Sequence, residues 1–110
     1  MDVQDKNIEY LKLLGYIYMR YGKWEKAKII FEAIKELAPP DIYTSKALAY
    51  TYLKTGDFAL SAAEAETIIN DGGESSYELG LYFKGKALLA LGNEAESKTI
   101  IERILQRRST

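Results

Sequence analysis

Apolar and small residues recur at intervals of three and four along most of this chain. That is the period of an amphipathic α-helix, whereas a half-buried strand alternates every second residue. Residues 7–21 place one such set on a single face: Ile8, Leu11, Leu14, Gly15 and Tyr18. Residues 24–37 do the same with a second set: Ala27, Ile30, Phe31, Ile34 and Leu37. The pattern favours helix over strand in every segment of the chain.

Glycine and proline divide the chain into six segments of about 13–16 residues, each long enough for a helix. The predicted breaks are Gly22, Pro39-Pro40, Gly56, Gly72-Gly73 and Gly92. We therefore predict an all-α fold.

Polar residues at the starts of several segments support this division. Asp41, Asp57 and Asn93 stand where an N-cap oxygen would accept a hydrogen bond from free amides of the first helical turn. Residues 75–78 read Ser-Ser-Tyr-Glu, which has the spacing of a capping box. We expect helices to begin at these places.

The chain repeats itself internally. A shift of 34 residues pairs Gly15 with Ala49, Tyr18 with Tyr52, Gly22 with Gly56, Trp24 with Phe58, Ala27 with Ser61 and Ile34 with Ile68. A further shift of 36 pairs Ala49 with Gly85, Tyr52 with Leu88, Gly56 with Gly92 and Ser61 with Ser97. The paired small residues predict places where two helices cross closely, and Trp24 and Phe58 are expected to lie between successive helix pairs. Three helix pairs in 110 residues indicate a repeat architecture.

At these residues the chain resembles the tetratricopeptide repeat (TPR) family. The first copy carries its 34-residue pattern at Leu11, Leu14-Gly15, Tyr18, Ala27, Phe31 and Pro39, with Leu11 where tryptophan is usual. The second copy is looser and has Ala65 and Gly73 where the pattern has phenylalanine and proline. The resemblance implies a right-handed α-solenoid of three helix pairs, at about 8–37, 41–70 and 75–107. We expect an N-terminal tail over 1–7 and one domain over 8–110, with repeats at about 8–41, 42–75 and 76–110.

The resemblance also implies a concave groove, lined by one face of the first helix of each pair. In the first copy that face carries Glu9, Lys12, Tyr16, Met19 and Arg20. In the second it carries Tyr43, Lys46, Tyr50, Leu53 and Lys54, and in the third Leu79, Tyr82, Lys86, Leu89 and Ala90. Tyrosines mixed with cations suit the binding of an amphipathic helix or an extended peptide that bears some negative charge. The alternative is that some of these tyrosines pack against neighbouring helices, as we expect of Tyr18 and Tyr52.

One TPR subclass can be tested directly on the sequence. Chaperone-adaptor TPR domains hold a C-terminal carboxylate with five polar and basic residues. Lys12 and Lys86 fit that set, but Tyr16, Tyr50 and Tyr82 occupy the other three positions. We therefore expect no recognition of heat-shock-protein tails.

The last predicted helix is apolar on two sides. Its apolar residues are Ile100, Ile101, Ile104 and Leu105. TPR arrays normally finish with a solvating helix, and only residues 106–110 follow here. We predict an exposed edge that a partner or a second copy covers; the alternative is that a capping helix has been lost by truncation.

Composition narrows the possible chemistry. The chain has 15 Lys and Arg against 16 Asp and Glu, a net charge of −1, which argues against a dedicated nucleic-acid binder. It has no histidine and no cysteine, which excludes a zinc or iron–sulfur centre and a Cys or Ser–His nucleophile. Glu64 and Glu66, like Glu94 and Glu96, are interpreted as solvated charges. We predict no cofactor, no metal and no catalytic residue.

No segment has the pattern of a targeting signal or a membrane span. The first residues contain no apolar core, and the longest apolar run, residues 87–91, is far shorter than the ~20 residues a bilayer requires. The sequence predicts a cytoplasmic protein.

A narrower resemblance suggests a function. The residues Leu14-Gly15, Tyr21-Gly22, Ala27, Phe31-Glu32-Ala33 and Leu37-Ala38-Pro39 are similar to the first repeat of small TPR chaperones of bacterial type III secretion. That resemblance implies a groove that holds a needle, translocator or export-apparatus subunit, often together with a helical co-chaperone. The alternative is a TPR adaptor or scaffold, either a homodimer through the exposed edge or a domain of a larger protein. An enzyme that uses only carboxylates and tyrosine is the least favoured hypothesis.

Overall fold

The computed structural model describes residues 3–109, and within them it contains six α-helices and no strand. The helices are α1 (Val3–Arg20), α2 (Trp24–Leu37), α3 (Ile42–Thr55), α4 (Phe58–Asp71), α5 (Glu74–Ala90) and α6 (Glu94–Arg108). The all-α prediction is confirmed, and each of the six predicted segments corresponds to one helix. The first helix begins at Val3, so the described part of the expected tail 1–7 is helical; residues 1 and 2 lie outside the described residues. Within the described range, none of the helices has the length and apolar character that crossing a bilayer requires.

Three of the turns share one backbone geometry. Gly22, Gly56 and Gly92 each follow a helix with φ of 70°, 81° and 86°, the left-handed region that glycine enters without steric cost. In each turn the next amide donates to the carbonyl five residues earlier: Lys23 to Tyr18, Asp57 to Tyr52 and Asn93 to Leu88. The glycines lie 34 and 36 residues apart, so the structure repeats with the period of the sequence.

Only some of the predicted helix starts have the capping interaction that the sequence suggests. Asp41 caps α3 as predicted, since its Oδ1 accepts from the Thr44 amide at 2.8 Å. Asp57 and Asn93 occupy N-cap positions but make no capping hydrogen bond with their side chains. The capping box over residues 75–78 is wrong: α5 begins earlier, at Glu74, because Gly73 turns the chain there with φ of 78°.

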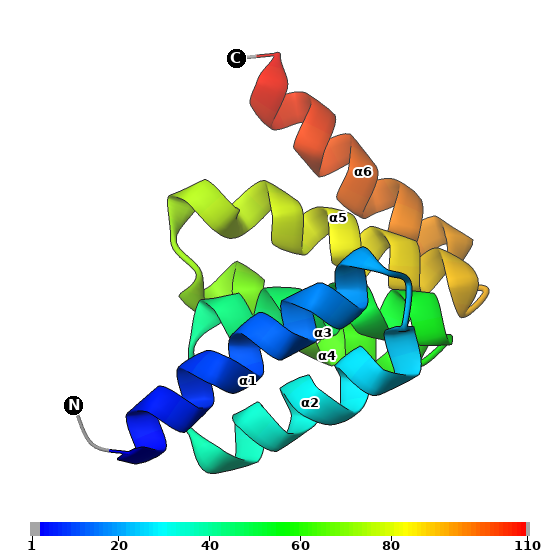
Figure 1. Cartoon of the computed structure of the whole chain (residues 1–110). Helices are drawn as coiled ribbons and strands as arrows, with labels where there is room; N and C mark the ends of the chain where they lie inside the picture. Colours follow the sequence, from blue (N-terminus) through cyan, green and yellow to red (C-terminus); the bar gives the residue numbers. More distant parts are fainter. Residues whose placement is uncertain (1–2, 110) are drawn as a thin grey trace.

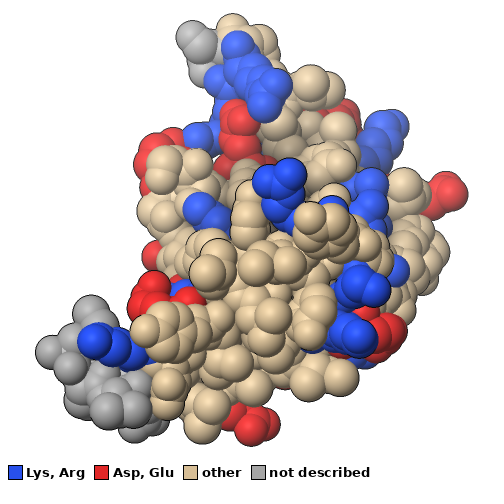
Figure 2. All heavy atoms as spheres, in the orientation of Figure 1, with Lys and Arg blue, Asp and Glu red and all other residues tan. Residues whose placement is uncertain are grey.

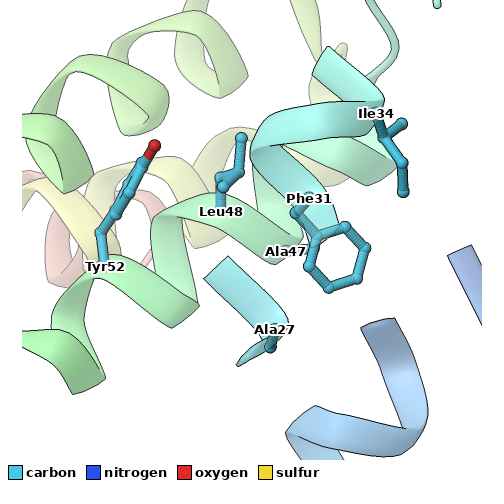
Figure 3. Packing of buried hydrophobic residues seen from close by; sticks show 6 residues of the cluster. All are labelled: Ala27, Phe31, Ile34, Ala47, Leu48 and Tyr52. Carbon is cyan, nitrogen blue, oxygen red and sulfur yellow. The ribbon is translucent and has the colours of Figure 1, made fainter. Parts of the chain in front are cut away.

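Helices adjacent in the chain pack against one another. Figure 1 shows α1 and α2 side by side across the front, α3 and α4 behind them, and α5 and α6 beyond, with the end of α6 projecting from the body. The largest cluster of buried apolar side chains lies between α2 and α3 (Figure 3) and consists of Ala27, Phe31, Ile34, Ala47, Leu48 and Tyr52. The molecule is elongated, measuring 46 × 27 × 21 Å.

The paired small residues lie at close helix crossings, as predicted. A Cβ on Gly15 would stand 2.7 Å from the ring of Phe31, so α1 and α2 can meet here only without a side chain. In the next two pairs a serine hydroxyl bonds across the crossing: Ser61 to the carbonyl of Ala49 at 2.7 Å, and Ser97 to that of Gly85 at 2.8 Å. The same twelve-residue interval separates the bonded residues in both pairs.

Ion pairs join helices of successive pairs and correct one expectation. Glu64 is only 4 % exposed and accepts from Lys35 of α2 at 2.7 Å, so its interpretation as a solvated charge is wrong. The Lys35–Glu64 contact joins α2 to α4 across 29 residues of sequence. Glu66 is partly exposed but lies 2.8 Å from the Lys84 ammonium, whereas Glu94 and Glu96 are exposed as expected.

Candidate protein-binding surface

Two hollows lie on the predicted groove face. The first has a volume of about 480 Å³ and lies between α1 and α3, lined by Glu9, Lys12, Leu13, Tyr16 and Tyr43. The second has a volume of about 280 Å³ and lies between α3 and α5, lined by Tyr50, Leu53, Lys54, Phe58, Tyr82, Lys86 and Ala90. Tyr43 and Tyr50 are seven residues apart and therefore lie on one side of α3, which connects the two hollows.

Lys12 organises the first hollow. Its Nζ lies 3.3 Å from Asp41, 3.9 Å from Glu9 and 5.6 Å from the centre of the Tyr43 ring. Burial alone would raise the pKa of Asp41, but the Thr44 amide and hydroxyl and the Lys12 ammonium outweigh it and hold the pKa below its ordinary value. Burial raises the pKa of Tyr43, although Lys12 opposes the shift. The charge of Lys12 is thus already matched by carboxylates of the chain itself.

The second hollow has unpaired cations. Lys54 lies over the rings of Trp24 and Tyr50, with its Nζ 5.6 and 5.4 Å from their centres. Lys86 lies over Tyr82 at 5.7 Å. Stacking of this kind contributes about 0.5–1 kcal/mol at an exposed site, and it leaves the ammonium groups open to solvent. No carboxylate among residues 6–109 forms an ion pair with either lysine, so both can accept an acidic group from outside.

Aromatic contacts hold the second hollow in place. Trp24 meets Tyr50 edge-on with ring centres 5.5 Å apart, and the Phe83 ring lies 6.2 Å from Tyr50 and 6.0 Å from Tyr82. The expected position of Trp24 between the first two helix pairs is confirmed. Sequence reasoning missed Phe83, whose counterpart in the second copy is Ala47; an aromatic ring in place of alanine was the available signal.

The predicted groove residues differ in exposure and in whether they line a hollow. Tyr16, Tyr43, Tyr50 and Tyr82 are 37–47 % exposed, as a binding surface requires. Met19 packs against the buried cluster of α2 and α3, and Lys46 is half-buried. Three other predicted residues are exposed but line neither hollow: Arg20, Leu79 and Leu89. Of the two tyrosines expected to pack inside, Tyr52 is buried and donates to Glu32, and Tyr18 is half-buried.

The predicted edge of α6 is smaller than expected. Ile100 is wrongly assigned to it, since this side chain is 3 % exposed and packs in a core cluster with Leu81 and Leu88. Ile104 packs partly against the same cluster, while Ile101 is 38 % and Leu105 60 % exposed. Only the last two side chains offer substantial apolar surface.

The described residues contain no cluster of acidic side chains that could hold a metal ion. The two hollows are lined mainly by tyrosine rings, aliphatic side chains and lysine ammonium groups. Comparison with family models, with curated proteins and with solved structures finds no match to this chain.

Proposed function

We propose that this chain is a non-catalytic protein-binding module of the TPR type, which holds a segment of a client protein along the surface formed by α1, α3 and α5. The observation that carries the proposal is the set of half-exposed tyrosines from three helices, gathered in two adjoining hollows with cations stacked over them. Large amphipathic rings with few torsions to freeze are well suited to recognition.

The repeated geometry supports a right-handed solenoid of three TPR pairs. The helices α2, α4 and α6 begin at residues 24, 58 and 94, which are 34 and 36 residues apart. The left-handed glycines and the serine-to-carbonyl bonds recur with the same spacing. In such a solenoid the first helices of the pairs share one face, and that face carries both hollows.

The chemistry of the hollows suggests the character of the client. Lys54 and Lys86 favour a segment with acidic residues near the second hollow, while the tyrosines and Leu53 accept its apolar side chains. An amphipathic helix with apolar and acidic positions fits these requirements, and so does an extended peptide.

The resemblance to small TPR chaperones of type III secretion suggests which kind of protein the client is. On that proposal the client is an export substrate or a subunit of the export apparatus, with a helical segment that would otherwise aggregate. On this proposal the surface covers the apolar segment until the client is released. This is equilibrium binding that follows mass action, and it needs no ATP.

Capture from the native source tests the proposal. Tagged full-length chain should retain one dominant small protein at near-equal stoichiometry, identified by mass spectrometry. The double variant Tyr50→Ala/Tyr82→Ala should lose that protein while keeping its helical circular dichroism, because neither ring belongs to a core cluster. The control Leu60→Ala removes an exposed apolar side chain of α4, outside both hollows, and should capture as the wild type does.

A client that binds the tyrosine double variant as well as the wild type would contradict the proposal. The second candidate function is an adaptor or scaffold, which the exposure of Ile101 and Leu105 on α6 favours. Capture of several large assembly subunits, lost on Ile101→Glu/Leu105→Glu, would support that function instead.

A further inference from the structure

A stripe of exposed apolar side chains runs along the outer face of α1, away from the side that packs on the core. The stripe consists of Tyr10, Leu13, Leu14, Ile17 and Tyr21, which are 64, 59, 37, 41 and 76 % exposed. Figure 1 places α1 across the front of the molecule, and Figure 2 shows mostly uncharged surface along the same path. The stripe is separate from the tyrosine surface, by which we mean Tyr16, Tyr43, Tyr50 and Tyr82 and the two hollows beside them; only Leu13 belongs to both, since it also lines the first hollow.

The stripe has the spacing of a helix-pairing seam. Tyr10, Leu14, Ile17 and Tyr21 follow one another at intervals of four, three and four, which keeps apolar side chains facing one partner helix. None of the five side chains is charged at neutral pH, so covering them desolvates no ion.

The residue types along the seam read the same in both directions: aromatic, aliphatic, aliphatic, aromatic. An antiparallel copy of α1 therefore matches it residue for residue. Tyr10 meets Tyr21 of the second copy, and Leu14 meets Ile17 of the second copy. Such self-matching is what a two-fold symmetric interface requires. The tyrosine hydroxyls at both ends of the seam can still reach water.

The stripe supplies most of the area that a dimer requires. Five side chains of this size at these exposures present about 600 Å² per copy, at the top of the range for apolar patches on monomers. A stable interface buries about 800 Å² per partner. The exposed flanking residues Lys6 and Arg20 can supply much of the difference with their aliphatic stems. The net charge of −1 opposes association of two copies only weakly.

We propose that this chain forms a symmetric dimer through antiparallel pairing of the α1 stripes of two copies. The tyrosines Tyr16, Tyr43, Tyr50 and Tyr82 lie outside the seam. The second hollow contains no stripe residue and stays open in the dimer, whereas Leu13 at the edge of the first hollow is covered. The interface is also distinct from the α6 edge, where the sequence pattern suggests that a partner or a second copy would bind.

Sedimentation equilibrium of the full chain over a range of concentrations tests the proposal. The wild type should reach twice the chain mass of 12.5 kDa. Leu14→Glu/Ile17→Glu should remain at the monomer mass, because it buries two carboxylates in the seam. Two controls should dimerise like the wild type: Ile29→Glu, at a 64 % exposed site of α2, and Leu105→Glu on α6. A wild-type chain that stays monomeric, or a stripe variant that dimerises normally, would overturn the proposal.

Disulfide trapping keeps the proposal testable even if the charged variant fails to fold. The natural chain has no cysteine, so each introduced thiol is unique. Antiparallel pairing predicts that an oxidised mixture of Leu14→Cys and Ile17→Cys chains forms chiefly the mixed disulfide dimer, since these two positions face each other across the seam. Disulfides formed chiefly within each variant, or none at all, would contradict the antiparallel seam.

Discussion

At the scale of single residues, Gly15 and Asp41 link local chemistry to the arrangement of the helices. Gly15 lets α1 approach Phe31 of α2, and Asp41 both caps α3 and pairs with Lys12 of α1. The close approach at Gly15 and the cap at Asp41 could be predicted, since each repeat has a small residue at the position of Gly15 and Asp41 precedes a helix. The pairing of Asp41 with Lys12 could not be predicted, because it depends on how α1 and α3 are placed. The burial of Glu64 could not be predicted, because it depends on how α4 packs in the folded chain, where Lys35, 29 residues earlier, contacts the carboxylate.

Gly15→Ala should destabilise the fold. The added methyl group would meet the fully buried Phe31 ring at 2.7 Å, and overpacking of this kind costs about 1–3 kcal/mol, more than alanine's gain in helix propensity. The matched change is Gly85→Ala, whose Cβ would meet the end of Ile101 at 3.2 Å and Ile100 at an ordinary contact distance of 3.6 Å. Urea unfolding should show a lower midpoint for Gly15→Ala and little change for Gly85→Ala; equal losses would argue against the described crossing of α1 and α2.

Asp41→Ala should lower the free energy of unfolding by about 1 kcal/mol at neutral pH, because α3 loses its cap. The pKa of Asp41 is lower in the folded chain than in the unfolded one, so its stabilisation is present above the unfolded pKa and fades as pH falls through the folded pKa. The deficit of the variant should therefore narrow in acid, below pH about 4. Asp41→Asn, which can still cap the helix, should lose less. A deficit that stays constant with pH would show that the carboxylate charge has no part in it.

At the scale of helices, the residues of the turns indicate best where the helices begin and end. The period of apolar residues predicts six helices, and Gly22, Gly56 and Gly92 mark where three of them end. The start of α5 differs from the prediction because Ser75 and Glu78 have capping spacing, whereas the left-handed Gly73 fixes the turn first. The sequence shows the capping spacing of residues 75–78 but not the backbone conformation of Gly73, so the start of α5 could not be placed from the motif alone.

Gly56→Ala should destabilise the turn between α3 and α4 by about 1–2 kcal/mol through its left-handed backbone. A Cβ added at this glycine would meet nothing within 4 Å beyond its own chain neighbours, so steric contact adds nothing to that cost. Gly56→Asn should lose less, because asparagine tolerates this conformation better. Thermal unfolding followed by circular dichroism compares the two, and an alanine variant as stable as the wild type would contradict the role given to this turn.

At the scale of the whole molecule, three surfaces have different origins in the sequence. The tyrosine surface follows from two sources: the helical period places its residues on one face of each first helix, and the resemblance to TPR repeats implies that these faces line a groove. The α6 edge is smaller than predicted, because Ile100 and Ile104 turn toward α5, which the period alone cannot establish. The α1 stripe could not be predicted, because the apolar period groups Leu14 with the core-facing residues of α1. The structure shows that Leu14 is exposed, since no other helix in the described part of the chain covers this side of α1.

The central claim is that α1, α3 and α5 bind a client through the tyrosine surface. Amide hydrogen exchange of the full chain, measured alone and with its captured client, tests this most directly. We predict slower exchange concentrated in those three helices around Tyr16, Tyr43, Tyr50 and Tyr82, with little change in α2 and α4. Protection confined to α2 and α4, or to the end of α6, would contradict the claim.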